Sequence, residues 1–325
     1  MKLTALEIKK GDAYLLQNDN NENFLFDAGS PKVVNLLYQK GCCYLNVAIC
    51  SHNDSDHTAG FENLLKSCVQ IDELWLPDIW ASIVSFLNEH YNEISEDYIE
   101  KLKREVKNAD VDIQAIYHLQ EENPLNIERI QYNTIYEKLP YKIDNIVKIF
   151  KLARCRNIRI RFFKPLNYEV NNVCNFGFVA KNSEEVNSVP VLNSITQLAM
   201  AIKLSAENKY SLVFEYCQND PKALFTADSD LCFVQQTGIH YNGSMVITAP
   251  HHGSDSNASA YNKIQANNPF YIRTFYNKKH SIKAFLALQN CKKYCVRCCH
   301  QEQEVVFEWY NNRWNNISGH RCKCP

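Results

Sequence analysis

Short apolar runs that end in turn-forming residues recur along the first 76 residues of the chain. Runs of this length predict β-strands, whereas apolar residues spaced by three or four predict helices. We expect strands over 3–8, 12–17, 23–27, 44–51 and 71–76, and helices over 31–40 and 61–68. Alternating strands and helices are typical of the α/β class.

A charged stretch with helical spacing interrupts this pattern between residues 77 and 122. Its charges include pairs four residues apart, such as Asp97 and Lys101, which stabilise exposed helices. We interpret the stretch as a helical insertion or lid. A helix over 143–155 and a strand over 158–163 are expected after it.

The second half of the chain repeats the alternation of strands and helices. We expect strands over 197–204, 210–216, 223–226, 245–249 and 269–273, a helix over 282–289 and a terminal hairpin over 294–310. We predict one domain over 1–290 and a small Cys-rich C-terminal element over 291–325.

Composition excludes several classes of protein. The 325 residues are 46% hydrophobic and 22% charged with a net charge of −1, which is typical of a folded globular chain. No apolar run approaches the length of a membrane span, and the first residues lack the apolar core of a secretory signal. We therefore expect a cytoplasmic protein with no membrane partner. The near-zero charge argues against a dedicated nucleic-acid coat, but it allows an enzyme that contacts a few phosphates.

Candidate metal ligands follow four of the predicted strands. The run His52-Asn53-Asp54-Ser55-Asp56-His57 holds four of them, and Asp27, Asp228 and the pair His251-His252 end three other strands. Imidazole and carboxylate groups bind divalent ions, and two such ions close together can clamp the attacking and leaving oxygens of a hydrolysis. A polar loop that only caps the next helix is the alternative for the 52–57 run alone. Four strand ends of this kind favour a metal site.

With Lys10-Gly11-Asp12-Ala13-Tyr14, Leu224-Phe225-Thr226-Ala227-Asp228 and Pro250-His251-His252-Gly253-Ser254, these motifs resemble the metallo-β-lactamase superfamily. Asp54 stands where the superfamily's signature usually has a second His. This substitution makes the chain most similar to ComEC-like competence hydrolase domains. The resemblance implies an αββα sandwich with two divalent metal ions, Zn²⁺ or Mn²⁺, between the sheets.

The resemblance also implies roles for individual residues. His52 and Asp54 would hold the first metal, Asp56 and His57 the second, and Asp228 would bridge the two. His251 would complete the second site and His252 would contact the substrate, although the choice between these neighbours stays open. Asp27 would orient ligands from behind. The expected metal ligands are His52, Asp54, Asp56, His57, Asp228 and His251. The expected catalytic residues are Asp56, His252 and Asn193.

Asn193 is included because the superfamily usually supplies another His before the bridging Asp, and none lies between His118 and His240. Leu192-Asn193-Ser194 is similar to an Asn-containing segment of ComEC-like proteins. A site with so many carboxylates suits Mn²⁺ better than a His-rich zinc site does. We therefore expect the highest activity with Mn²⁺.

Two further clusters carry weaker signals. Eight basic residues from Lys142 to Lys164 could guide the phosphate backbone of a nucleic acid toward the metals. Alternatively, they form the solvent-exposed face of an edge strand. The C-terminal cysteines could hold a structural zinc ion or remain free thiols. The zinc candidates are Cys295, Cys298, Cys299, His300, Cys322 and Cys324.

The sequence thus predicts a metal-dependent hydrolase that uses a metal-bound hydroxide, most simply a phosphodiesterase or nuclease with nucleic acid as substrate. One alternative is a hydrolase of acyl or lactone esters. The other is a metal-binding subunit with a protein partner in a multi-component system, for instance in phage defence.

Overall fold

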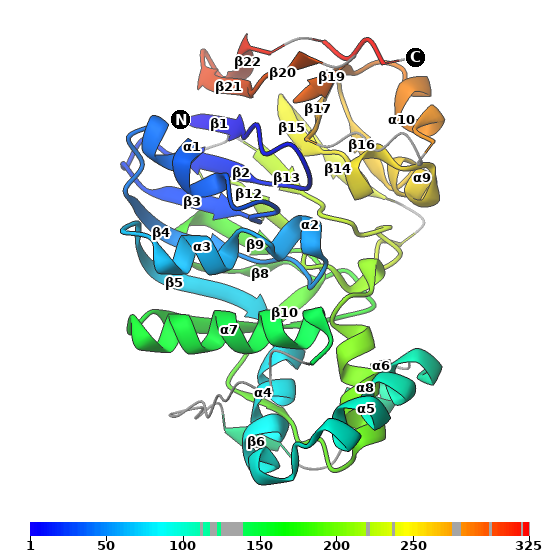
Figure 1. Cartoon of the computed structure of the whole chain (residues 1–325). Helices are drawn as coiled ribbons and strands as arrows, with labels where there is room; N and C mark the ends of the chain where they lie inside the picture. The colour runs from blue at the N-terminus through cyan, green and yellow to red at the C-terminus, as the bar shows by residue number, and fades with distance from the viewer. Residues whose placement is uncertain are drawn as a thin grey trace.

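Two β-sheets packed face to face form the centre of the molecule (Figure 1). The computed structural model describes residues 1–110, 113–117, 122–124, 139–218, 222–235, 238–274, 281–298, 301–319 and 321–324. Helices cover the outer face of each sheet, so the layers follow the order α, β, β, α. This is the αββα architecture predicted from the sequence.

The first sheet has nine strands among the described residues, in the order β10-β7-β5-β4-β3-β2-β1-β21-β22. Parallel pairing joins β3 to β4, β4 to β5 and β5 to β7, so these four strands end at the same edge. Their bounds are β1 (Lys2–Ala5), β2 (Tyr14–Gln17), β3 (Asn23–Phe26), β4 (Tyr44–Ile49), β5 (Gln70–Pro77), β7 (Arg159–Pro165), β10 (Ser183–Val186), β21 (Val305–Tyr310) and β22 (Arg313–Ser318).

The second sheet has seven strands in the described part of the chain, in the order β18-β17-β15-β13-β12-β9-β8. The first four of these are parallel. Their bounds are β8 (Asn172–Val173), β9 (Phe178–Ala180), β12 (Phe214–Tyr216), β13 (Lys222–Phe225), β15 (Met245–Thr248), β17 (Phe270–Arg273) and β18 (Lys292–Cys295). Short ladders pair β6 (Glu122–Pro124) with β11 (Ser188–Pro190), β14 (Ile239–Tyr241) with β16 (Ile264–Ala266), and β19 (Arg297–Cys298) with β20 (Gln301–Glu302).

Aromatic side chains fill the space between the two sheets. Successive residues of a strand point to opposite faces, so Phe24 and Phe26 of β3 enter this inner core while Leu25 faces the helices. Phe26 stacks on Phe225 of the opposite sheet with ring centroids 4.8 Å apart. The helices on the first sheet are α1 (Val33–Gln39), α3 (Phe61–Lys66) and α7 (Tyr141–Cys155), and those on the second are α9 (Ala258–Tyr261) and α10 (Lys283–Ala287).

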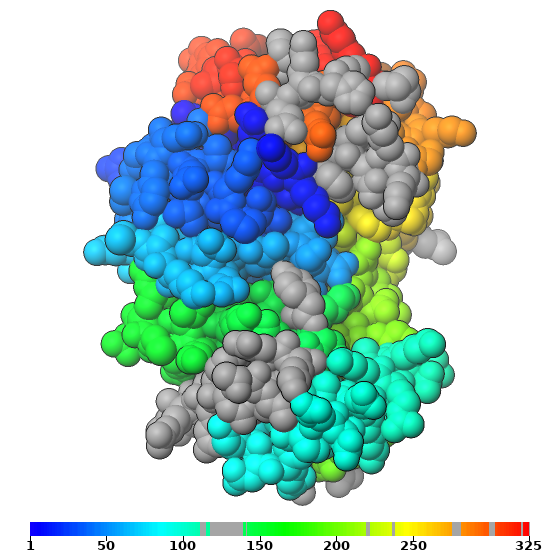
Figure 2. Space-filling view, in the orientation of Figure 1, coloured from blue at the N-terminus to red at the C-terminus, as the bar shows by residue number. Residues whose placement is uncertain are grey.

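A group of helices extends from one end of the sandwich (Figure 2). The expected insertion over 77–122 contains α4 (Ile79–Glu89), η1 (Tyr91–Glu93), α5 (Glu96–Asn108) and α6 (Ile113–Tyr117). The segment 197–204, predicted as a strand, is instead part of helix α8 (Ile195–Leu204), which packs against α4 and α5. Periodicity cannot separate a short buried strand from a buried helix, and the Ser194 hydroxyl caps this helix by accepting from the Gln197 N–H.

The C-terminal residues lie at the opposite end of the molecule and belong to the sandwich (Figures 1 and 2). Residues 291–325, expected as a separate element, supply β18 to one sheet and β21 and β22 to the other. The antiparallel pair of β19 and β20 lies within the hairpin predicted over 294–310, and a longer antiparallel pair of β21 and β22 follows it. Among the described residues, no helix combines the length and the apolar character needed to cross a membrane.

Candidate metal centre

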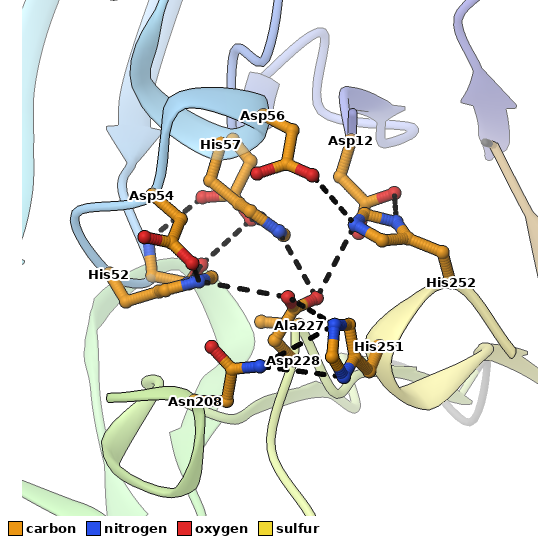
Figure 3. Close-up of polar contacts among 12 residues, drawn as sticks. Asp12, His52, Asp54, Asp56, His57, Asn208, Ala227, Asp228, His251 and His252 are labelled. Atoms are coloured by element: carbon orange, nitrogen blue, oxygen red, sulfur yellow. Dashed lines mark hydrogen bonds and ion pairs between the residues drawn. The ribbon is translucent and has the colours of Figure 1, made fainter. Parts of the chain in front are cut away.

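Histidine and aspartate side chains from both sheets meet where the parallel strands end (Figure 3). The loop after β4 carries His52, Asp54 and helix α2 (Ser55–Thr58), which includes Asp56 and His57. Asp228 follows β13, and His251 and His252 lie in η5 (Pro250–Gly253) after β15. The carboxyl ends of parallel strands share one edge of a sheet, so loops far apart in sequence face one another here.

Two glycines hold the His52–His57 loop in place. A Cβ at Gly11 or at Gly29 would lie 1.9 Å from the carbonyl oxygen of Asp56, so no larger residue fits either position. This close approach lets the Asp12 N–H donate to the same carbonyl at 2.8 Å. Gly11 and Gly29 therefore fix the backbone that presents Asp56 and His57.

Asp27 sets the orientation of the histidines from behind. It is fully buried and accepts hydrogen bonds from the Ser51 N–H, the Ser51 hydroxyl and His57 Nδ1, each at 2.8 Å. The Ser51 hydroxyl donates to Asp27, so its oxygen accepts from His52 Nδ1 at 3.0 Å. The Nδ1 atoms of both rings are thus hydrogen-bonded in this network, and the Nε2 atoms point toward the centre of the site.

Within the described part of the chain, several buried atoms at this centre make no hydrogen bond, and they include Nε2 of His52, Nε2 of His57 and Oδ1 of Asp228. His57 Nε2 lies 3.1 Å from Asp228 Oδ1, and His52 Nε2 lies 3.8 Å from Asp228 Oδ2 and from Asp54 Oδ2. Lone pairs of nitrogen and carboxylate oxygen that face one another repel unless a proton or a metal ion lies between them. Ligand atoms around an ion with bonds of about 2.1 Å lie roughly 3 to 3.5 Å apart. The 3.1 Å distance lies within this range and the 3.8 Å distances lie slightly above it, so small side-chain shifts would let these residues bind a divalent metal.

The two adjacent histidines face different sides of Asp228. His252 Nε2 lies 3.5 Å from Asp56 Oδ2 and from Asp228 Oδ1, on the side of His57. His251 Nε2 lies 3.5 Å from Asp228 Oδ2, on the side of His52. The sequence assigned His251 to the second group, but the geometry gives that position to His252. Both residues have left-handed backbones, with φ of 47° and 52°, and this sends their side chains apart.

Asp12 is a residue of the site to which sequence reasoning gave no role. It is buried beside β2 and lies 3.0 Å from His252 Nδ1 through Oδ1. The hydroxyls of Thr274, at the end of β17, and of Tyr14 also donate to it. Asp12 therefore orients His252 as Asp27 orients His57. Its one signal in the sequence is its place beside Gly11 in the motif of residues 10–14.

Asn193 does not meet the other predicted residues. It is exposed just before α8, whereas Ser205, just after α8, accepts a hydrogen bond from the Asn53 N–H of the ligand loop. A helix of this length holds its ends about 15 Å apart, so Asn193 and Ser205 lie at opposite ends of it. Two other asparagines contact His251 Nδ1: Asn208 of η4 (Asn208–Tyr210), whose Nδ2 lies 3.4 Å away, and Asn257, whose Oδ1 lies 3.1 Å away.

Of the basic run over 142–164, Lys142 reaches the site. Its amino group donates to Asp54 Oδ1 at 2.8 Å, and its side chain is 42% exposed, so an anionic ligand can reach it. Arg161 instead is buried in ion pairs with Glu73 and Glu185. Arg156 donates to three backbone carbonyls, two in the last turn of α3 and one after it. β7 lies between β5 and β10, so it is not the edge strand considered above.

Electrostatics couple the central groups strongly. Burial lowers the pKa of His57, but Asp228 and Asp27 raise it more, and the net pKa lies well above the usual value. Burial and then His57 lower the pKa of His52, which keeps that ring neutral. Burial raises the pKa of Asp228, but His57 and His252 outweigh it, and the net pKa lies well below the usual value. Asp228 is therefore an ionised carboxylate between imidazoles.

The arrangement offers two groups of ligands that share Asp228. His52, Asp54 and His251 lie toward Oδ2, and Asp56, His57 and His252 lie toward Oδ1. Asp54, Asp56 and His251 are the partly exposed members, so the site opens to solvent on their side. An open site of this kind can admit a substrate beside the metals.

Four cysteines gather about the end of β18. The sulfur atoms of Cys295, Cys298, Cys322 and Cys324 all lie within 4.8 Å of one another. Cys299 and His300, two further candidates from the sequence, lie outside the described residues.

Comparisons with known proteins find structural likeness without sequence likeness. No protein-family model matches the chain, and no curated protein does. The metallo-β-lactamase fold protein YhfI from Bacillus subtilis aligns over 95% of this chain and 100% of its own, with 10% identity and a TM-score of 0.41. Zn²⁺-bound PqqB from Methylobacterium extorquens aligns over 94% of this chain and 100% of its own, with 7% identity and a TM-score of 0.44. Likeness at this level transfers neither substrate nor metal content.

Proposed function

We propose that this chain is a metal-dependent hydrolase that cleaves phosphodiesters. The observation that carries the proposal is the convergence of His52 Nε2, His57 Nε2 and the Asp228 carboxylate, whose buried atoms lack partners of hydrogen-bond geometry within the described residues. Leaving such atoms unpaired costs free energy, so folding maintains them for a ligand. The ligand that suits nitrogen and carboxylate donors is a divalent cation.

Two groups of residues would hold the metals. One consists of His52, Asp54, His251 and Asp228, and the other of Asp56, His57, His252 and Asp228. Divalent ions bound there would lower the pKa of water and polarise the bond under attack. The set contains four imidazoles and three carboxylates, one imidazole more than expected from the sequence, so it suits Zn²⁺ as well as Mn²⁺.

The chain's own residues prepare the site for this chemistry. Asp27 and Asp12 hold the Nδ1 atoms of His57 and His252, so the Nε2 atoms stay aimed at the centre. Lys142 presents a positive charge beside Asp54 at the open side. A phosphodiester is an anion, and an exposed amino group at the entrance attracts it more than it attracts a neutral ester. The resemblance of the motifs to ComEC-like domains points to the same substrate class.

The test compares substrates and metals. Metal-free protein is reloaded with Mn²⁺ or with Zn²⁺ and assayed on single- and double-stranded DNA and RNA, bis(p-nitrophenyl) phosphate and p-nitrophenyl acetate. We expect phosphodiester cleavage that needs the added metal and exceeds ester cleavage. Lys142→Gln should raise the KM for the phosphodiester and leave that for the acetate unchanged.

His240→Ala serves as the matched control, because His240 is an exposed histidine on β14 outside the site. Preference for the acetate would replace the phosphodiesterase with an ester hydrolase. Metal binding without activity on any substrate would favour a metal-binding subunit of a larger complex.

A further inference from the structure

The cysteine cluster has the dimensions of a tetrahedral sulfur site. All four sulfurs lie within 4.8 Å of one another, and those of Cys298 and Cys324 are 3.7 Å apart. A tetrahedron with Zn–S bonds of 2.3 Å has sulfur–sulfur edges of about 3.8 Å. None of these four cysteines forms a disulfide with another described residue. Their spacing therefore matches one ion at their centre.

Backbone pairing brings the two halves of the cluster together. Cys295 is the last residue of β18 and Cys298 the last residue of β19, so two residues separate them. Cys322 and Cys324 come from the last described residues, where a β-bridge joins Tyr294 to Arg321 and the Cys322 N–H donates to the Lys293 carbonyl at 2.7 Å. The terminal segment thus runs beside β18, and the sulfurs of Cys322 and Cys324 lie close to those of Cys295 and Cys298.

A buried positive charge lies against these sulfurs. Arg273, at the end of β17, is 1% exposed and donates from Nε to Cys295 Sγ at 3.0 Å and from a terminal nitrogen to Cys324 Sγ at 2.8 Å. The Lys323 N–H donates to Cys298 Sγ at 3.0 Å. Hydrogen bonds of this kind stabilise thiolates rather than thiols, and a guanidinium always carries its charge. These donors favour ionised sulfur, against the burial that raises the pKa of Cys295.

We propose that Cys295, Cys298, Cys322 and Cys324 bind one Zn²⁺ in a closed structural site. Four thiolates and one Zn²⁺ carry a net charge of −2, and Arg273 offsets one unit of it. Four sulfur ligands complete the tetrahedron, so no position is left for water or substrate. Zinc prefers this geometry, and its binding free energy contributes directly to folding.

The ion would connect the C-terminal segment to the catalytic side of the second sheet. Arg273 precedes Thr274, whose hydroxyl donates to Asp12, and Asp12 orients His252. A Cβ at Gly253 would lie 3.5 Å from Cδ of Arg273, so this side chain also packs against the histidine loop. The link to His252 rests on the proposed function, whereas the zinc site itself does not.

The experiment replaces zinc by cobalt in the wild-type chain under reducing conditions. We expect absorption bands of thiolate-to-cobalt charge transfer, which the histidine and carboxylate ligands around Asp228 cannot produce. Elemental analysis of the zinc-loaded Cys322→Ser/Cys324→Ser variant should give one zinc fewer per chain, and its cobalt form should lack these bands. Cys291→Ser, just before β18 and outside the cluster, is the matched control and should keep both.

Several results would overturn the proposal. They are a wild-type chain without the charge-transfer bands, an unchanged zinc count in the double variant, iron in place of zinc, or disulfides between these cysteines in the reduced protein. The wild-type spectrum decides even if the double variant does not fold. Failure of the hydrolase assay leaves the cobalt spectrum unaffected, so the two proposals can fail separately.

Discussion

The two ligand clusters of this molecule are built in opposite ways. Around Asp228, nitrogen and oxygen atoms come from several loops of both sheets, and Asp54, Asp56 and His251 have side chains that are 31%, 24% and 22% exposed. At the end of β18, four sulfurs come from two short segments, and Cys295 and Cys298 are only 2% and 7% exposed. Cys322 and Cys324 are partly exposed, so the two clusters differ in their ligand atoms more than in their burial. The first arrangement would keep a side open for a substrate, whereas four sulfurs would complete the coordination of one ion in the second.

The supporting residues differ in the same sense. Asp27 and Asp12 fix the orientation of individual rings around Asp228, since a reaction needs each ligand atom in a defined direction. Arg273 and the Lys323 N–H instead supply charge and hydrogen bonds to sulfurs. The comparison indicates that a site for a reaction needs residues that orient each ligand. A site for a structural ion would need mainly residues that compensate its charge.

The largest expected effect comes from removing the carboxylate that the two histidine groups share. Asp228→Ala should lower kcat/KM by at least about a thousand-fold, more than the 10- to 100-fold typical of losing a ligand's supporting partner. The chain should still fold and keep the cobalt charge-transfer bands of the cysteine site, because the clusters are independent. Asp97→Ala, on the exposed face of α5, is the control. Retained activity would remove the shared role of Asp228.

The pH dependence of metal binding at the histidine groups should be nearly as large. In the metal-free chain, burial lowers the pKa of His57 and of His252, but neighbouring carboxylates raise each well above its usual value. Both rings are therefore protonated below these raised values, and a metal must displace both protons. The apparent affinity should rise with pH by up to about tenfold per unit for each proton, and level off above the raised pKa values.

Calorimetry of Mn²⁺ binding in buffers of different ionisation enthalpy counts the protons released. His57→Ala should release one proton fewer than the wild type, and His240→Ala should release the same number. An affinity that does not change with pH would contradict the assigned role of the two rings.

The smallest effect tests directional support alone. Asp12→Asn keeps the size of the side chain but removes the carboxylate that holds His252 Nδ1, so activity should fall about 10- to 100-fold. Tyr14→Phe also removes a hydrogen bond to Asp12 but leaves His252 in place, and it should have little effect. Equal losses in both variants would point to general disruption of the β2 region.

The sequence predicted the layers of the fold and most of the residues that meet around Asp228. The ends of strands can be predicted from neighbouring residues alone, because runs such as Met245–Thr248 stop where the polar motif begins. The α/β class followed from the order of strands and helices, and the αββα sandwich from the resemblance of the motifs to the metallo-β-lactamase superfamily. Helix α8 could not be separated from a buried strand, since Leu198, Ala199, Ala201 and Ile202 are all buried and leave no clear period.

The finer details of the site depend on backbone conformation and on contacts distant in sequence. The exchange of His251 and His252 follows from two successive left-handed residues, which no spacing rule reveals. Asp12 joins the site through the fold of the β1–β2 loop. Asn208 contacts His251 from beyond the end of α8, whereas Asn193 lies before the start of that helix. The four cysteines that meet are selected by the bridge between Tyr294 and Arg321.

The contact of Gly11 and Gly29 with the Asp56 carbonyl has a consequence for how this chain tolerates mutation. Neither glycine offers a side chain to a metal, yet any side chain there would displace the segment that carries Asp56 and His57. A saturation scan scored by activity should rank these two positions beside the ligands themselves. Positions that do not tolerate substitution in this protein therefore include glycines that leave room for a backbone as well as residues that do chemistry. A map of such positions would show the residues packed against the His52–His57 loop together with its metal-binding residues.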